Sequence, residues 1–173
     1  MSRYEPWPAR PGAYVLLLRL GRGQWIKFAR GRGAWFPAGW YAYAGQARGP
    51  GGLRARLGRH WHGPQRRHWH IDHLRAYAQP VGWLYTLDPS PAQPWECRWS
   101  QYLAARRDAF IPAPGFGASD CRTGCRAHLI AFPFTTPLEG LIFHLCGLTP
   151  RAVAALAPYA TRGSSRHSAT AQD

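Results

Sequence analysis

The chain has 173 residues, of which 46% are hydrophobic, including nine Trp, eight Tyr and seven Phe. This composition is sufficient for one folded domain and excludes wholesale disorder. Twenty-two Lys and Arg against eight Asp and Glu give a formal net charge of +14; the imbalance favours a polyanionic partner, with nucleic acid ahead of a membrane surface.

The first part of the chain predicts an irregular lead-in and two strands. Residues 1–11 are rich in proline. The continuous apolar run at 12–20 indicates a buried strand, and the alternating pattern at 24–30 indicates a second strand. Because the turn sequence GRG at 21–23 separates them, we expect these two strands to form a hairpin.

A third strand is predicted at 40–45, which reads WYAYAG. Tyr41 and Tyr43 should point to one face of this strand, while Trp40 and the two alanines point to the other. Gly45 is expected to let the backbone turn sharply into the basic segment that follows.

That basic segment predicts a short helix at 53–61. Leu53 and Leu57 fall on one stripe of the helix, and Arg56 and His60 lie one turn apart on a neighbouring stripe. A cationic helix that follows a strand in this way is one means of presenting a phosphate group to reactive side chains.

Two helices and one strand are predicted in the middle of the chain. The segment 68–78 predicts a helix and 81–87 predicts a strand. After a proline pair, Trp95, Trp99 and Leu103 recur at the spacing of a helix with one apolar face.

The last third of the chain changes character. A glycine-rich loop at 115–132 should run into a final strand, and 135–160 should form an extension of two short helices, the second capped by Thr149. Residues 161–173 read as a disordered tail. The pattern as a whole predicts a small α+β fold, with an antiparallel or mixed sheet flanked by helices and a main domain at 12–132.

Two tripeptides, GAY at 12–14 and YAG at 43–45, are followed by RLGRH at 56–60. This order resembles the GIY-YIG nuclease superfamily, in which a later helix carries a metal-binding glutamate, here Glu96. The blocks FPAGWYAYAG, GPGGLRARLGRH, HWHIDHL and GFGASDCR are similar to an uncharacterised branch of that superfamily, some members of which are fused to endonuclease III-type repair enzymes. The resemblance covers roughly residues 12–132.

The resemblance implies a metal-dependent DNA endonuclease, with a role in repair or on branched or damaged DNA. Glu96 would hold Mg²⁺ or Mn²⁺, and Arg56 would clamp the phosphate. Tyr14 or Tyr43 would orient or deprotonate the attacking water, and His60 would share the proton transfer. From the strand pattern alone, packing is the preferred interpretation of both tyrosines.

The branch resemblance also places His70 in the expected catalytic group, beside Asp72. Basic and aromatic residues interleave around these positions, a mixture that can hold phosphates and stack bases. DNA is expected ahead of RNA as the partner. The arginines expected to contact it are Arg48, Arg54, Arg59, Arg66 and Arg67.

The cysteines offer an alternative metal site. Cys121, Cys125 and His128 have near-zinc spacing, and Cys97 is a candidate for the fourth ligand. This leaves two rival functions: a non-catalytic nucleic-acid-binding module and a zinc-stabilised interaction domain. The cysteine pattern does not suggest a disulfide framework, and no apolar run reaches the ~20 residues of a membrane span, so we expect a cytoplasmic protein. The oligomeric state is left open.

Overall fold

The computed structural model describes residues 6–90 and 92–158. Seven strands and four helices follow one another in these residues, and the predicted α+β class is confirmed. In chain order the elements are β1 (Gly12–Leu20), β2 (Gln24–Ala29), β3 (Arg32–Phe36), β4 (Gly39–Ala47), α1 (Gly52–His62), α2 (His70–Arg75), β5 (Gln79–Thr86), α3 (Trp95–Ala104), β6 (Leu129–Phe132), α4 (Leu138–Leu148) and β7 (Val153–Leu156).

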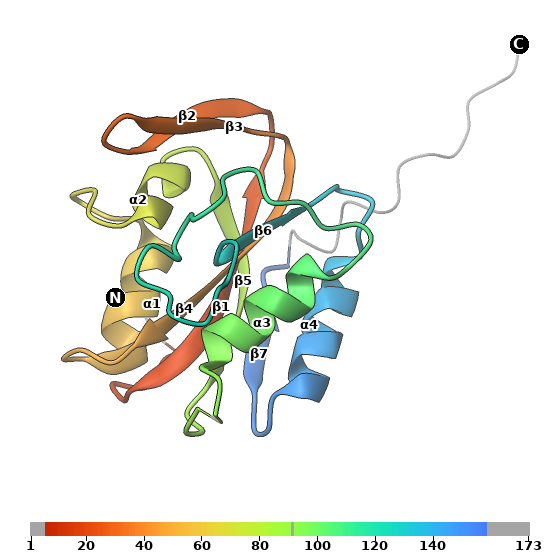
Figure 1. Ribbon diagram of the computed structural model, residues 1–173. Helices are drawn as coiled ribbons and strands as arrows, with labels where there is room; N and C mark the ends of the chain where they lie inside the picture. Colours follow the sequence, from red (N-terminus) through yellow and green to blue (C-terminus); the bar gives the residue numbers. More distant parts are fainter. Residues whose placement is uncertain (1–5, 91, 159–173) are drawn as a thin grey trace, which may run out of the picture.

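A five-stranded antiparallel sheet forms the centre of the molecule, in the order β6-β4-β1-β5-β7 (Figure 1). The central strand β1 is almost wholly buried, as its continuous apolar run predicts. One face of the sheet packs on apolar residues of α1 and α2, and the other packs on apolar residues of α3 and α4.

The predicted faces of β4 are confirmed. Tyr41 and Tyr43 belong to the core on the α1 and α2 side, whereas Trp40, Ala42 and Ala44 belong to the core on the α3 and α4 side. The first face of the sheet is therefore rich in tyrosine, and on the second face the small side chains of Ala42 and Ala44 allow α3 to approach β4 closely.

The predicted hairpin between 12–20 and 24–30 is wrong. Both edges of β1 are occupied, by β4 and β5, and β2 pairs instead with β3 in a separate two-stranded sheet that lies against α2 (Figure 1). Gly31 has φ +69° at the turn between β2 and β3, a conformation that glycine adopts readily. Strand β3 was not predicted because it has only five residues and begins within a second GRG sequence, at 31–33, which is typical of a turn.

The helix predictions have mixed outcomes. Leu53 and Leu57 of α1 are fully buried, and the apolar stripe of α3 is also buried, as predicted. The predicted helix after Thr149 is wrong, because Val153–Leu156 forms β7 and pairs with β5. The Thr149 hydroxyl accepts a hydrogen bond from Trp99 Nε1 at 2.8 Å and donates one to the Leu145 carbonyl at 2.7 Å, so this residue ends α4.

The remaining predictions concern the lead-in, the C-terminal tail and membrane-spanning segments. Within the lead-in, Trp7 is buried and its ring lies 5.9 Å from that of Trp61 and 6.0 Å from that of Trp83, measured between centroids. The disordered tail predicted at 161–173 lies outside the described residues. None of the helices in the described ranges combines the length and the apolar character that crossing a bilayer requires.

One edge of the sheet positions the candidate site. The edge strand β6 pairs with β4 only over Trp40–Tyr43, and beyond this ladder the Ala44 amide donates to the His128 carbonyl at 2.9 Å. Past that point the edge of β4 is bordered by the irregular segment 113–128. Side chains from both faces of the sheet can therefore meet around this edge.

Candidate functional site

A cavity of about 600 Å³ lies at this edge of β4. Its size is in the range of sites that bind small molecules or nucleotide-sized groups. It is formed by β4, α1, the start of α3 and the segment 117–128, and its charged and phenolic lining residues are Tyr43, Arg48, Arg56, Glu96, Asp120 and Arg122. Three guanidinium groups and two carboxylates thus share one hollow, an arrangement suited to a phosphate and a cation together.

Arg56 and Glu96 enter the cavity from elements on opposite faces of the sheet. Glu96 Oε1 accepts a hydrogen bond from the Gln46 side chain. Glu96 Oε2 and Arg56 Nε are both buried, and neither has a hydrogen-bond partner among the described residues. The Arg56 guanidinium carbon lies 4.5 Å from the centroid of the Trp69 ring, so the guanidinium group packs on this ring. Since buried charged atoms without partners are costly, an ion or ligand group in the cavity could offset this cost for both atoms.

The two predicted tyrosines, Tyr14 and Tyr43, lie on the neighbouring strands β1 and β4 at different depths from the cavity. Tyr43 lines it, whereas Tyr14 is fully buried, and their ring centroids are 6.5 Å apart. Burial raises the pKa of Tyr14 to about 12, although the charge of Arg56 opposes the shift. Burial, together with the nearby Tyr14, raises the pKa of Tyr43 as well. Both phenols therefore keep their protons at neutral pH.

Gly45 serves this packing and not a turn, so that expectation is wrong. It lies within β4 directly opposite Tyr14, and a Cβ atom at Gly45 would lie 2.6 Å from the Tyr14 hydroxyl oxygen. The absent side chain leaves the space that the phenol occupies.

His60 lies behind the tyrosines and not in the cavity lining. It is fully buried, and its ring centroid is 6.1 Å from both tyrosine rings. Burial lowers its pKa, against the opposing effect of Asp72, whose Oδ1 is 3.5 Å from His60 Nδ1. A neutral imidazole at this position supports the tyrosine rings.

Asp72 is the charged centre of that supporting layer. Its Oδ2 accepts hydrogen bonds from Arg59 at 2.6 Å and from the backbone amides of His68 and Trp69 at 2.8 and 3.0 Å. Burial favours its protonated form, but these donors and His60 outweigh burial and lower its pKa. Asp72 therefore stays ionised and ties α1 to α2.

His70 anchors the glycine-rich segment. Its Nδ1 accepts a hydrogen bond from the Gly117 amide at 3.1 Å, and its ring packs on Phe28 and Phe116. Gly117 has φ +72°, and a Cβ atom there would lie 2.7 Å from the Tyr43 ring. His70 therefore reaches the cavity only through the loop that borders it.

The five arginines expected to contact nucleic acid are spread over more than one surface. Arg48 lines the cavity, whereas Arg54 and Arg59 line a second hollow on another face of α1. Arg66 and Arg67 are exposed in the loop after α1. Sequence reasoning missed Arg122 as a member of the cavity, where its position next to Cys121 was the available signal.

Four candidate metal ligands adjoin the cavity. Cys97 Sγ lies 3.7 Å from Cys121 Sγ and 3.7 Å from His128 Nε2, and the donor atoms of these residues and Cys125 all lie within 4.8 Å of one another. Such a cluster can hold a metal ion, and its thiol-rich donor set suits zinc better than magnesium. The fourth ligand that the sequence suggested, Cys97, is thus where a metal would require it.

The fold and the site define a small antiparallel α+β domain with a cationic cavity beside a Cys₃His cluster. The chain belongs to the family described as "Domain of unknown function DUF123", which it matches over residues 13–146. The match spans β1 to α4 and contains every residue of the cavity and the cluster. No curated protein and no solved structure matches the chain significantly.

This family match corrects the resemblance drawn from the two tripeptides. The prediction that the chain is a member of the GIY-YIG superfamily is wrong on this finding, because the matching family has no assigned function and nothing in the match names that superfamily. The Cys₃His cluster beside Glu96 is also a feature that the resemblance did not imply. Any function must therefore be argued from the cavity itself.

Proposed function

We propose that this chain is a metal-dependent endonuclease that hydrolyses phosphodiester bonds in nucleic acid, with DNA preferred over RNA. The observation that carries the proposal is that Glu96 and Arg56, which have opposite charges, line one cavity. Glu96 Oε2 and Arg56 Nε are both buried and have no hydrogen-bond partner among the described residues. A phosphate group with a bound cation satisfies both atoms at once. The net charge of +14 supports a polyanionic substrate.

The carboxylates fit a hard divalent ion. Glu96 retains one unpartnered oxygen, and Asp120 lines the same cavity, which matches the one or two carboxylates by which proteins commonly hold Mg²⁺. Mg²⁺ or Mn²⁺ at Glu96 would supply Lewis-acid stabilisation of the charge that develops on the phosphate oxygens.

The remaining roles belong to the chain's own side chains. Arg56, with Arg48 and Arg122, would hold the phosphate and offset the additional negative charge of the transition state. Because its pKa is raised, Tyr43 would donate a hydrogen bond that orients the phosphate or the attacking water. Asp120 is the carboxylate available either as a second ligand of the ion or as the acceptor of the water's proton.

One observation favours a second candidate function, a nucleic-acid-binding module without turnover. Both phenols have raised pKa values, and His60 is shielded from the cavity. Apart from Glu96 and the Cys₃His cluster, Asp120 is therefore the acid–base group in the described cavity lining that remains for the proton transfer. If Asp120 does not take it, the same cationic cavity would bind a phosphate without cleaving it.

Cleavage of defined DNA structures separates the two functions. Purified protein would be incubated with nicked, flapped and branched duplexes, with and without Mg²⁺, and compared with Glu96→Gln. Glu139→Gln, which alters an exposed glutamate on α4, is the matched control. We expect Mg²⁺-dependent cutting by the wild type and the control and none by Glu96→Gln. Binding without cutting by all three proteins would support the binding module instead.

A further inference from the structure

We infer that the Cys₃His cluster binds one structural zinc ion, and that this ion holds the two carboxylates of the cavity in position. The cluster consists of Cys97, Cys121, Cys125 and His128. The inference of zinc binding is based on the geometry of these four residues. The positioning role rests in addition on the proposed function of the cavity.

Two of the separations between donor atoms match tetrahedral zinc, and all of them lie within 4.8 Å. With ordinary zinc–sulfur and zinc–nitrogen bond lengths, two tetrahedral ligand sulfurs lie ~3.8 Å apart, and a sulfur and a nitrogen ~3.6 Å apart. The observed separations are 3.7 Å between the Cys97 and Cys121 sulfurs and 3.7 Å between Cys97 Sγ and His128 Nε2. Since a disulfide requires sulfurs ~2.05 Å apart, the geometry points to a shared ion and not to a covalent bond.

The four ligands come from two separate parts of the fold, α3 and the irregular segment 113–128. Cys97 lies in the first turn of α3, Cys121 and Cys125 lie in the irregular segment before β6, and His128 immediately precedes β6. That segment contains three glycines with positive φ, at 115, 117 and 124, and no helix or strand. A metal ion would connect this segment to α3, which regular secondary structure does not do here.

Each carboxylate of the cavity immediately precedes a ligand in the sequence. Glu96 is followed by Cys97, and Asp120 is followed by Cys121. An ion bound by the two cysteines would therefore fix the backbone beside both carboxylates and set their separation across the cavity. Asp120, which is exposed on the loop, depends most on this restraint.

Metal analysis of the untagged protein tests zinc binding. We expect one zinc per chain, and we expect Co²⁺ substituted for zinc to give the visible absorption of a tetrahedral cobalt–thiolate site. Cys125→Ser should lose both signals. Cys146→Ser should keep them, because Cys146 lies in α4 outside the cluster. Wild-type protein that is free of zinc and does not take up added Zn²⁺ or Co²⁺ would overturn the inference.

Mn²⁺ binding tests the positioning role without requiring cleavage. Electron paramagnetic resonance would measure Mn²⁺ affinity in zinc-loaded wild type, Cys125→Ser, His128→Cys and Glu96→Gln, with circular dichroism as the check on folding. We expect Cys125→Ser to bind Mn²⁺ about ten-fold more weakly or worse. His128→Cys, which retains four ligands, should bind zinc and Mn²⁺ nearly as the wild type does. If Cys125→Ser does not fold, the comparison of zinc-free with zinc-loaded wild type takes its place.

The outcomes separate this inference from the proposed function. If the wild type cuts no DNA but its Mn²⁺ affinity depends on zinc, the endonuclease proposal fails and the positioning role stands. If zinc-free protein binds Mn²⁺ and cuts DNA as well as zinc-loaded protein, the positioning role is contradicted and the endonuclease proposal stands.

Discussion

Gly45 is constrained by a tyrosine on the neighbouring strand. An added Cβ atom would approach the Tyr14 hydroxyl to 2.6 Å, so Gly45→Ala must displace a buried phenol. We expect it to lower the free energy of unfolding by about 1–3 kcal/mol, the usual effect of overpacking. Urea denaturation would measure this. Gly49→Ala is the control, because no atom lies within 4 Å of its Cβ position; equal stabilities of the two variants would contradict the packing account.

Asp72 gives a prediction that depends on pH. Its carboxylate accepts hydrogen bonds from Arg59 and from two backbone amides, and its pKa is lowered in the folded state. We expect Asp72→Asn to lose about 1.5–3 kcal/mol of stability at pH 7, as for other hydrogen bonds to charged groups.

The sign of the pH effect follows from that lowered pKa. The stabilisation by Asp72 is complete above the pKa of an unfolded aspartate and declines as the pH falls below it towards the folded-state value. The difference between wild type and Asp72→Asn should therefore shrink below about pH 4. A difference that stays constant between pH 7 and pH 3 would show that the ionised form of Asp72 is not what stabilises the protein.

At this scale the sequence predicted some of the site and missed the rest. Tyr43, Arg56 and Glu96 were named from their motifs, and the structure brings them to one cavity. Asp120 and Arg122 were not assigned to it, because they lie in an irregular loop whose path is set by glycine conformations and by the anchor on His70. Periodicity gives no information about such a path.

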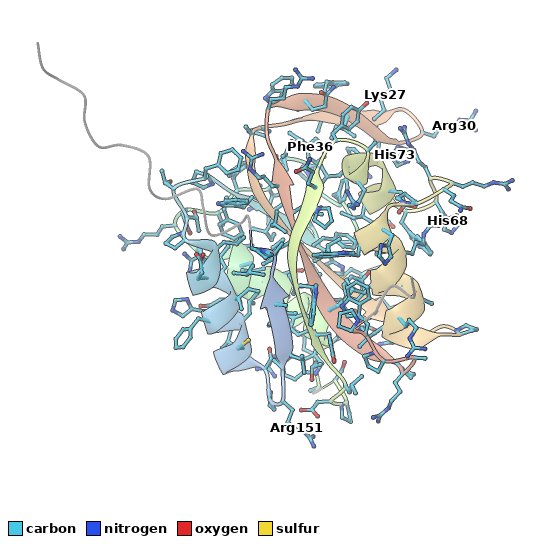
Figure 2. The ribbon with its side chains drawn as sticks, turned by 180° about the vertical axis from the view of Figure 1, so that it is seen from behind. Lys27, Arg30, Phe36, His68, His73 and Arg151 are labelled. Atoms are coloured by element: carbon cyan, nitrogen blue, oxygen red, sulfur yellow. The ribbon has the colours of Figure 1, made fainter. Side chains whose placement is uncertain are left out.

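Among the elements, the β2–β3 hairpin carries an exposed pair of tryptophans. Trp25 and Trp35 are cross-strand partners, and each is 56% exposed. Figure 2 shows Lys27 and Arg30 of the same hairpin at the end of the molecule opposite Arg151. Basic residues beside exposed aromatic rings can hold a nucleic-acid backbone and stack its unpaired bases.

This hairpin yields a prediction about single-stranded DNA. Trp25→Ala and Trp35→Ala should each weaken binding by about 1–3 kcal/mol if a base stacks on the ring, as measured by fluorescence anisotropy. Phe143→Ala, at a 75% exposed aromatic residue on α4, should leave the affinity unchanged. Equal effects of all three substitutions would argue against a stacking surface on the hairpin.

The strands that were mispredicted have a common cause. β7 is a four-residue edge strand of alanine, valine and leucine, and such residues also suit a helix. It forms a strand through its pairing with β5. Similarly, β2 pairs with β3, while both edges of β1 are occupied by β4 and β5. Where tertiary pairing decides the element, local sequence preference is a weak guide.

For the whole molecule, the charge predicts a strong dependence of DNA binding on salt. The logarithm of the affinity should fall linearly with the logarithm of the salt concentration. If Arg48, Arg56 and Arg122 each contact a phosphate, their joint replacement by Gln should reduce the slope by about 2.7 on duplex DNA, about 0.9 for each contact. An unchanged slope would show that the cavity does not contact the DNA backbone.

The central claim is that Glu96 and Arg56 act on the same phosphate in one cavity. A double-mutant cycle on the single-turnover cleavage rate tests this directly, with Glu96→Gln, Arg56→Ala and the double variant assayed on one branched DNA in Mg²⁺. We predict that each single change slows cleavage by about 10²-fold or more, and that the double variant is little slower than the slower single variant. Losses that multiply, or single variants that cut like the wild type, would contradict the claim.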